Sequence, residues 1–326
     1  MVASAFRTLE GPLPESLRPM STGELLDRTF GLYKRHLLLF AAIAVPAPAL
    51  YTIFELLVTA FGGVTPMTGP GIPGLSPKAM IGSLSVVFLG VFAYMLGLSI
   101  THAVTVRAVS AVHLGRSITA VDAYRALRGR YLRIIGVFLT VAVLVFGGSM
   151  VLYVAAILIS IAAVAGGMKL GALAAVIGGI VALAAIVGTV IVAITLYVRY
   201  SLAVQACVVE DISIRQSLKR SAFLSKGSRS RILTVYILFA VLQFAIGMTL
   251  GLVANGATGF LHSIRLTQAT SALGGFVAGV LVSPLATIAM SLVYYDERVR
   301  KEAFDLQLMM AALDGPQSAA AASATS

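Results

Sequence analysis

Residues 170–198 read LGALAAVIGGIVALAAIVGTVIVAITLYV, a continuous run without a charged side chain. A helix needs about 20 predominantly apolar residues to cross the roughly 30 Å of hydrocarbon in a bilayer. This run exceeds that length, so it predicts a membrane-spanning helix. Comparable apolar runs lie on both sides of it along the chain, and together they predict six crossings, near residues 37–61, 79–106, 134–163, 170–198, 232–257 and 269–293.

The composition of the chain agrees with a membrane protein. Hydrophobic residues make up 59% of the 326 residues and charged residues only 11%, whereas soluble globular domains carry about 25% charged residues. The sequence therefore predicts an all-α fold, a polytopic bundle of about six transmembrane helices arranged as three hairpins. We expect one membrane domain over residues 21–314, a flexible cytoplasmic N-terminus over residues 1–20 and a disordered cytoplasmic tail over residues 315–326.

Basic residues are unevenly distributed between the two sides of these predicted crossings. Of the 24 Lys and Arg residues, 21 fall in the four stretches 1–36, 107–133, 199–231 and 294–326. The other three lie one apiece in the alternate connections. Cytoplasmic segments of membrane proteins carry such an excess of Lys and Arg. The pattern therefore predicts a multi-pass protein of the bacterial cytoplasmic (inner) membrane, with both termini in the cytoplasm.

The formal net charge of +11 is large enough to raise nucleic acid as a partner. However, the charges occupy short segments beside the predicted membrane ends, where anionic lipid headgroups are the nearest opposite charges. We therefore expect membrane phospholipids, and a protein on the same cytoplasmic face, as partners, with no nucleic acid. The oligomeric state stays open.

Motifs that carry catalysis are missing from the sequence. The four histidines are scattered over both predicted sides of the membrane, and the chain has no HExxH, nucleophile elbow or GxxxxGK[ST] loop. The single cysteine, Cys207, excludes an intramolecular disulfide and a thiolate metal cluster. Its apolar surroundings predict a packed small side chain. We expect a protein that is not an enzyme, without catalytic, cofactor or metal sites.

A pattern recurs three times along the chain. Ser21, Ser117 and Ser213 are separated by equal steps of 96 residues, and each precedes a short basic amphipathic segment and then two crossings. These segments predict three helices that lie in the cytoplasmic interface, with their apolar faces in the lipid boundary. Their starts have the spacing of helix-capping boxes, in the pairs Ser21–Glu24, Thr119–Asp122 and Ser213–Gln216.

The basic residues of the three segments are candidate contacts for lipid headgroups. We expect them to form one cytoplasmic ring around the bundle, because a juxtamembrane Lys or Arg attracts anionic lipid by about 1 kcal/mol near the surface. The alternative is that they only orient the protein, which requires no placement beyond the correct side. The candidates are Arg28, Lys34, Arg35, Arg125, Arg128, Arg130, Arg133, Lys219, Arg220, Lys226, Arg229 and Arg231.

Two features inside the crossings are also informative. Glu55 follows the Pro46–Ala47–Pro48 break in the first crossing and is the candidate intramembrane polar site. It is either a proton or cation site or a hydrated residue near the interface, about one turn from the predicted helix end. Gly275 and Gly279 have the GxxxG spacing that permits close helix contact.

The end of the last crossing, YYDERVRKEAFDLQL over residues 294–308, carries charges four residues apart. Such spacings favour a helix that continues beyond the membrane. We expect this helix to pack against the first amphipathic helix near Asp27 and Arg28, and a plain solvated helix is the alternative. The spaced pairs are Asp296–Arg300, Arg298–Glu302 and Lys301–Asp305.

Residues 21–40, STGELLDRTFGLYKRHLLLF, and residues 291–308, SLVYYDERVRKEAFDLQL, resemble motifs of a bacterial membrane-domain family. That family is named after glycerophosphoryl diester phosphodiesterase, and its members typically contain GELLDxxFxLYRRxF and YYDxRxRKEGxDL. Ala303 stands where the family commonly has glycine. A central segment, residues 215–231, is similar to the family's RSxxLxxGxxxR region. The matching positions are Gly23 to Phe30, Leu32 to Arg35, Arg220, Ser221, Leu224, Gly227, Arg231, Tyr294, Tyr295, Asp296, Arg298, Arg300, Lys301, Glu302 and Asp305.

The resemblance implies a stand-alone membrane module with a link to phospholipid metabolism. The family name comes from fusions to a catalytic barrel, and the motifs of that barrel are missing here, so the resemblance does not imply the hydrolase reaction. Two classes of function are therefore weighed. The first is a non-enzymatic scaffold or accessory protein with a basic cytoplasmic face, and the second is a small-solute or lipid transporter that uses the bundle interior.

Overall fold

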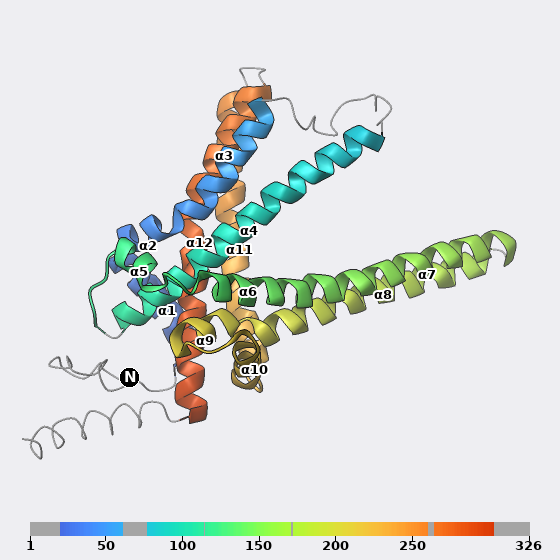
Figure 1. Ribbon diagram of the computed structural model, residues 1–326. Helices are drawn as coiled ribbons and strands as arrows, with labels where there is room; N and C mark the ends of the chain where they lie inside the picture. Colours follow the sequence, from blue (N-terminus) through green and yellow to red (C-terminus); the bar gives the residue numbers. More distant parts are fainter. Residues whose placement is uncertain (1–19, 61–76, 114, 171, 260–263, 303–326) are drawn as a thin grey trace, which may run out of the picture. The chain divides into compact units, whose positions relative to one another are not determined.

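The computed structural model describes residues 20–60, 77–113, 115–170, 172–259 and 264–302, and the structural statements below concern these residues. The expectations for the N-terminus up to residue 19, the tail at 315–326 and Asp305 lie outside them. Within the described ranges the chain is helical and contains no strand, which confirms the predicted all-α class. The helices are α1 (Thr22–Arg35), α2 (Leu37–Ala44), α3 (Pro46–Ala60), α4 (Pro77–His113), α5 (Ala120–Ala126), α6 (Tyr131–Ala142), the π-helical turn η2 (Val143–Gly147), α7 (Gly148–Leu170), α8 (Ala172–Tyr200), α9 (Ala203–Glu210), α10 (Ile214–Leu224), α11 (Arg229–Gly259) and α12 (Ile264–Glu302) (Figure 1).

Long apolar helices account for most of these residues. Five helical segments among the described residues are long and apolar enough to cross a membrane. Helices α2 and α3, which are bent by 43° relative to each other, are together long and apolar enough to form a sixth span. These spans support a multi-pass membrane protein, and each predicted crossing overlaps one span or the bent pair. The five single spans are Phe88–His113, Tyr131–Ala162, Gly178–Glu210, Arg229–Val253 and Ala269–Glu302.

The chain divides into two compact units. Unit 1 consists of Met1–Tyr131 and Thr234–Ser326, and unit 2 consists of Leu132–Leu233. In unit 1, α12 packs against α1, α2, α3 and α4, and α3 also packs against α4. Helix α12 is therefore the centre of unit 1.

Small residues allow the proline-containing start of α3 to approach its neighbours closely. A Cβ on Gly97 of α4 would lie 3.3 Å from the Cα of Ala47, and a Cβ on Gly279 of α12 would lie 2.9 Å from Cγ of Pro48. A Cβ on Gly275 would meet nothing within 4 Å. Of the two glycines in the GxxxG pair, Gly279 is therefore the one that permits a close helix contact within unit 1.

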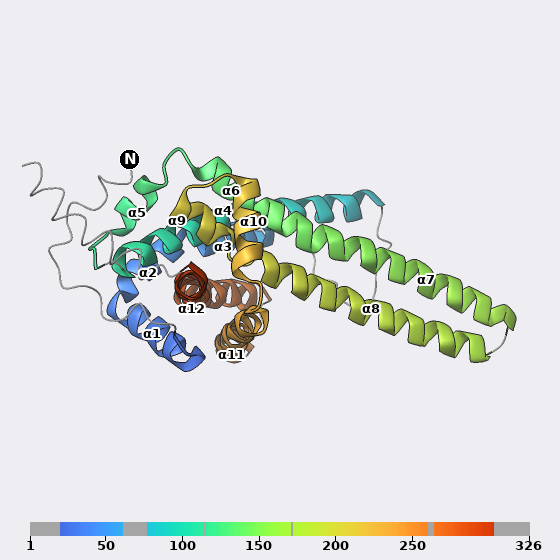
Figure 2. The same ribbon diagram turned by 90° about the horizontal axis from the view of Figure 1, so that it is seen from below.

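Unit 2 is built on a long helical hairpin. Helix α6 continues through the π-helical turn η2 into α7, and α7 runs beside α8 (Figures 1 and 2). Large apolar side chains on this hairpin are exposed, among them Phe146, Val151 and Leu183. Helices that satisfy their own backbone bonds and expose apolar side chains are suited to hydrocarbon.

The three predicted helix starts are confirmed. At α1, the backbone N–H of Ser21 donates to Glu24 Oε2 at 2.8 Å, and the N–H of Glu24 donates to Ser21 Oγ at 3.2 Å. At α5, the N–H of Asp122 donates to Thr119 Oγ1 at 3.2 Å. At α10, the backbone N–H and hydroxyl of Ser213 both donate to Gln216 Oε1, at 3.1 and 2.8 Å.

The helices α1, α5 and α10 each pack chiefly against helices other than the one that follows them directly. Helix α5 packs against α2 and α4, and α10 packs against α8 and α9, which precede them in the chain. Helix α1 packs chiefly against α12 of the last pair of spans. In each case the helix contacts its neighbours within its own compact unit.

Candidate functional site

Two adjacent carboxylates lie buried at the end of α12, where the sequence suggested a charge-laced helix. Asp296 is 2% exposed and Glu297 is 0% exposed. A buried charge is costly unless it is paired and hydrogen-bonded. Asp296 Oδ2 accepts a bond from Arg300 Nε at 2.8 Å, and Glu297 Oε2 lies 3.3 Å from Lys301 Nζ. The predicted Asp296–Arg300 spacing therefore forms an ion pair, while Lys301 turns back to a carboxylate that the sequence analysis did not single out.

The Asp296–Arg300 pair also holds the residue that precedes α1. The backbone N–H of Met20 donates to Asp296 Oδ1 at 2.6 Å, and the Met20 carbonyl accepts from Arg300 Nη2 at 2.6 Å. Met20 immediately precedes Ser21, the capping residue of α1. One ion pair on α12 therefore fixes the position at which α1 begins.

The expected contact between the end of α12 and the first amphipathic helix is present, but its residues differ from those expected. Met20 makes the contact with α12 through its backbone N–H and carbonyl, and Arg28 Nη1 donates to the Met20 sulfur at 3.5 Å. Arg298 Nε pairs with Glu302 Oε2 at 3.3 Å, as its spacing predicted. The contact with α12 is therefore made by the backbone of Met20, just before α1, and not by a charged side chain of that helix.

The two tyrosines of the same motif attach α12 to α4. Tyr294 is fully buried, and the Tyr295 hydroxyl donates to Ser110 Oγ at 2.9 Å. The ring of Tyr295 lies 5.2 Å from the ring of His113. The guanidinium of Arg298 lies 5.9 Å from the centre of the Tyr294 ring. The YYD segment is thus a packed junction of α12, α4 and the start of α1.

Tyrosine hydroxyls of α1 and α5 donate to carbonyls that lie three residues before a proline. Tyr33 Oη donates to the carbonyl of Leu281 at 2.5 Å, and Tyr124 Oη donates to the carbonyl of Ile43 at 2.9 Å. Burial raises the pKa of both hydroxyls above the usual 10.0. Both tyrosines therefore remain neutral donors at physiological pH.

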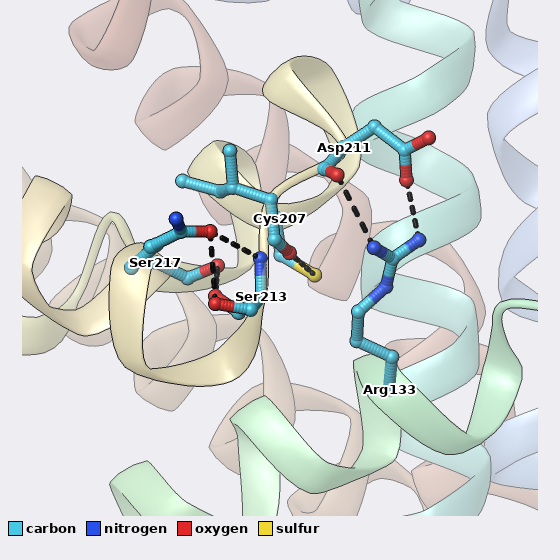
Figure 3. A network of polar contacts seen from close by, with 7 residues as sticks. Arg133, Cys207, Asp211, Ser213 and Ser217 are labelled. Atoms are coloured by element: carbon cyan, nitrogen blue, oxygen red, sulfur yellow. Dashed lines mark hydrogen bonds and ion pairs between the residues drawn. The ribbon is translucent and has the colours of Figure 1, made fainter.

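A second polar cluster lies in unit 2, between α6 and the connection from α9 to α10 (Figure 3). Arg133 pairs with the carboxylate of Asp211 and donates from Nη1 to the Asp211 carbonyl at 3.2 Å. Asp211 ends α9 with φ of 55°, a left-handed conformation that Asp tolerates better than most residues. Cys207 is buried beside it, as predicted for a packed side chain, and its sulfur lies 3.7 Å from the Ile212 carbonyl.

Residues 215–231, the central segment that resembles the family motif, bond to the last turn of α8. Ser221 Oγ donates to the carbonyl of Arg199 at 2.9 Å and accepts from the backbone N–H of Leu202 at 3.1 Å. Ser225 Oγ donates to the same Arg199 carbonyl at 3.2 Å. The last carbonyls of a helix need partners from outside it. Ser221 of α10 and Ser225, which follows α10 directly, supply one for α8 at Arg199, the first charged residue of that helix.

Other positions of this segment have structural roles as well. Arg220 Nε pairs with Glu210 Oε1 at 2.8 Å, which ties α10 to α9. Leu224 is fully buried, and Gly227 has φ of +88°, which favours glycine in the turn before α11. The resemblance motif thus coincides with residues that shape this turn and its packing.

The twelve basic candidates fall in both compact units, so the expected single ring stays a prediction. Arg28, Arg133, Arg220 and Arg231 are half-buried, and Arg133 and Arg220 form the ion pairs described above. The exposed candidates are Lys34, Arg35, Arg125, Arg128, Arg130, Lys219, Lys226 and Arg229.

Glu55 lies half-buried on α3, one turn beyond Tyr51, whose ring lies 5.4 Å from the ring of Tyr94 on α4. Its expected role as an intramembrane polar site stays a prediction. Within the described ranges, no three His, Cys, Asp or Glu side chains are grouped so that they could hold a metal ion.

Comparison with known proteins adds no relative. No protein-family model matches the chain, no curated protein matches it, and no solved structure matches it.

Proposed function

We propose that the protein is a non-enzymatic scaffold or accessory protein of the bacterial inner membrane, which contacts anionic lipid or a partner through a basic cytoplasmic face. The observation that carries this proposal is the position of the exposed cations at the starts of apolar helices. Lys34 and Arg35 precede α2, Arg128 and Arg130 precede α6, and Lys226 and Arg229 lie at the start of α11. Cations at this depth face headgroup phosphates.

The resemblance to the glycerophosphoryl diester phosphodiesterase membrane-domain family supports a link to phospholipid metabolism. The charged groups at the end of α12 support an accessory role, because Asp296 and Glu297 are paired with Arg300 and Lys301, and the first pair also bonds the backbone of Met20. A catalytic acid or base would need to reach a substrate. We therefore assign these groups to the framework of the protein.

Native mass spectrometry of the purified protein tests the lipid contact. We expect the wild type to retain anionic phospholipid over zwitterionic phospholipid. Replacement of Arg125, Arg128 and Arg130 by Gln should reduce this retention without inverting the topology. The matched control replaces Lys78, Lys169 and Arg265, which the sequence places on the opposite side of the membrane. If the wild type shows no lipid preference, the cations serve only to orient the protein in the membrane.

The proposed orientation has its own test. Reporter fusions within residues 62–78 or 258–268 should show no cytoplasmic activity, since both stretches are expected on the outer side. Fusions after residue 302 should show cytoplasmic activity. Cytoplasmic activity from either of the first two sites would contradict the proposed topology.

A small-solute or lipid transporter is the second candidate. The observation that favours it is a polar contact between two spans of unit 1, where Thr287 Oγ1 lies 3.2 Å from His102 Nδ1. Against it, the neighbouring hydroxyls of Thr105, Ser110 and Ser291 each bond a carbonyl one turn earlier in their own helix. That arrangement satisfies the hydroxyls within the helix and leaves small side chains for packing.

The conservative change Glu55→Gln separates the two candidates. A transporter that uses this carboxylate should lose pH-coupled uptake, because Gln cannot exchange a proton. A scaffold should show only a small change of stability. Reconstituted vesicles that contain the wild type and show no uptake of any solute above empty vesicles would remove the transporter from consideration.

A further inference from the structure

Helix α10 in unit 2 has two faces of opposite character. Ser217, Ser221 and Leu224 form a buried face, which packs against α8 and α9. Arg215 and Lys219 are exposed, and Phe223, four residues further, is 53% exposed. Residues four apart lie on one side of a helix. The exposed face therefore consists of two cations followed by a large aromatic ring.

The position of this face along the membrane normal follows from the bonds of its buried side. Ser221 and Ser225 both donate to the carbonyl of Arg199. Arg199 is the first charged residue after the uncharged run 170–198, so it marks the level at which α8 leaves the hydrocarbon. Helix α10 is thus held at the membrane surface by its serines.

The C-terminal end of α10 also leads to the membrane surface. The chain turns at Gly227, and the next span begins at Arg229. Lys226 is exposed in this turn, where its backbone N–H donates to the Phe223 carbonyl at 3.2 Å. The segment between two membrane spans is therefore short, basic and attached at both ends to span termini.

We infer that the exposed face of α10, formed by Arg215, Lys219 and Phe223 with Lys226 beside it, docks on anionic phospholipid headgroups of the adjoining leaflet. The cations bind headgroup phosphates, while the Phe223 ring enters the boundary between headgroups and acyl chains. Basic residues beside an exposed aromatic on an interfacial helix are suited to this. The inference rests on the proposed function and deepens it, because it assigns the lipid contact to one helix.

Arg133 and Arg220 are excluded from this site by their ion pairs with Asp211 and Glu210. These arginines were counted with the lipid contacts in the sequence analysis. Their guanidinium groups hold α6, α9 and α10 in place, so they position the site and do not provide its charge.

The first experiment titrates the full-length protein in detergent micelles with phosphatidylglycerol and follows binding by native mass spectrometry. Each surface cation contributes about a fivefold gain in affinity for anionic lipid. The double change Arg215→Gln and Lys219→Gln should therefore weaken binding by up to about 30-fold. The same titration with phosphatidylcholine should show no difference between variant and wild type.

The second experiment uses the absence of tryptophan from the chain. Phe223→Trp provides a single tryptophan, whose fluorescence should be quenched strongly by phosphatidylglycerol brominated near the headgroup end of its acyl chains. Phe146→Trp, on the exposed side of the hairpin within a span, should be quenched best by bromine deep in the bilayer. An unquenched, water-exposed Trp at position 223 would overturn the inference.

The outcomes separate this inference from the proposed function. If Arg215→Gln with Lys219→Gln binds phosphatidylglycerol as the wild type does, while the triple change at Arg125, Arg128 and Arg130 weakens binding, α10 is not the site and the proposed function stands. If the wild type shows no preference for phosphatidylglycerol over phosphatidylcholine, the inference fails together with the lipid contact of the proposed function. Weakened binding in the α10 variant together with shallow quenching supports both.

Discussion

Tyr33 of α1 donates its hydroxyl proton to the backbone carbonyl of Leu281, three residues before Pro284 in α12. Proline lacks the N–H that would bond the carbonyl of residue 280, and its ring pushes against that turn of the helix. Spans tolerate proline because neighbouring groups bond the carbonyls of the disturbed turn. Tyr33 is such a neighbour, and it comes from a helix outside the spans.

The same relation occurs at the other proline break of unit 1. Tyr124 of α5 donates to the carbonyl of Ile43, which lies three residues before Pro46, at the 43° bend between α2 and α3. Pro46 and Pro48 cannot donate to the last carbonyls of α2. Two amphipathic helices thus each hold a proline-interrupted span through a tyrosine. This assigns them a structural function that is independent of any lipid contact.

The first prediction removes these hydroxyls. Tyr33→Phe and Tyr124→Phe should each lower the free energy of unfolding by about 1–2 kcal/mol, because a part-buried carbonyl loses the donor from the neighbouring helix while the ring is kept. Chemical denaturation in mild detergent measures the change. Tyr51→Phe is the control, since it retains the ring contact with Tyr94 in the same unit. Equal effects at all three positions would show that proximity to proline is irrelevant.

The second prediction concerns alkaline pH. Burial raises the pKa of Tyr33 above 10.0 in the folded protein, so the folded state holds this proton more tightly than the unfolded state does. The stability that depends on the proton is complete below about pH 10 and declines as the pH rises through the folded pKa. The difference in unfolding free energy between wild type and Tyr33→Phe should therefore shrink above pH 10. A constant difference up to pH 12 would contradict this account.

Much of the fold follows from local pattern in the sequence. The apolar runs coincide with long helices, and the capping pairs at Ser21, Thr119 and Ser213 coincide with helix starts, because both depend on residues close together in the chain. The break at Pro46 is likewise local, since proline has no N–H wherever it occurs. The helices and their ends can therefore be predicted from residues that are close together in the chain.

The candidate site depended on packing that a single sequence does not contain. The spacing of charges predicted an exit helix that packs against the first amphipathic helix or is solvated, but it did not predict which carboxylates are buried, and Asp296 and Glu297 are. Their burial arises because α1 and α4 pack around α12, which brings Met20 to a residue 276 positions away. The partner of Asp296 outside α12 is the backbone N–H of Met20, and almost every residue has such a group, so side-chain identity gives no signal for this contact.

The third prediction tests the clamp on Met20. Asp296→Asn keeps an oxygen for the Met20 N–H but removes the charge that pairs with Arg300. We expect a loss of about 2 kcal/mol in unfolding free energy, less than for a fully buried pair because Arg300 is 38% exposed. Asp211→Asn is the matched control, since its pair with Arg133 is more exposed and Asn accepts a left-handed backbone. A smaller loss for Asp296→Asn than for Asp211→Asn would count against the clamp.

The fourth prediction concerns Asp27 of α1 and Arg298 of α12, which lie in the two segments that the sequence analysis expected to pack together. Arg298 pairs with Glu302 in the structure, so the charge reversals Asp27→Arg and Arg298→Glu should act independently. Their effects on unfolding free energy should add to within about 0.5 kcal/mol in a double-mutant cycle. Rescue of Arg298→Glu by Asp27→Arg would instead show that the side chains at positions 27 and 298 interact.

The fifth prediction separates the two glycines of the GxxxG pair. Gly279→Ala places a methyl group 2.9 Å from Cγ of Pro48, and the proline ring cannot rotate away as a flexible side chain would. Overpacking of this kind costs about 1–3 kcal/mol of unfolding free energy. Gly275→Ala, which meets nothing within 4 Å on the same helix, should leave stability unchanged or slightly raised. Equal destabilisation by the two changes would mean that Gly275 also lies in a close helix contact. Both glycines of the GxxxG pair would then permit that contact, as the sequence suggested.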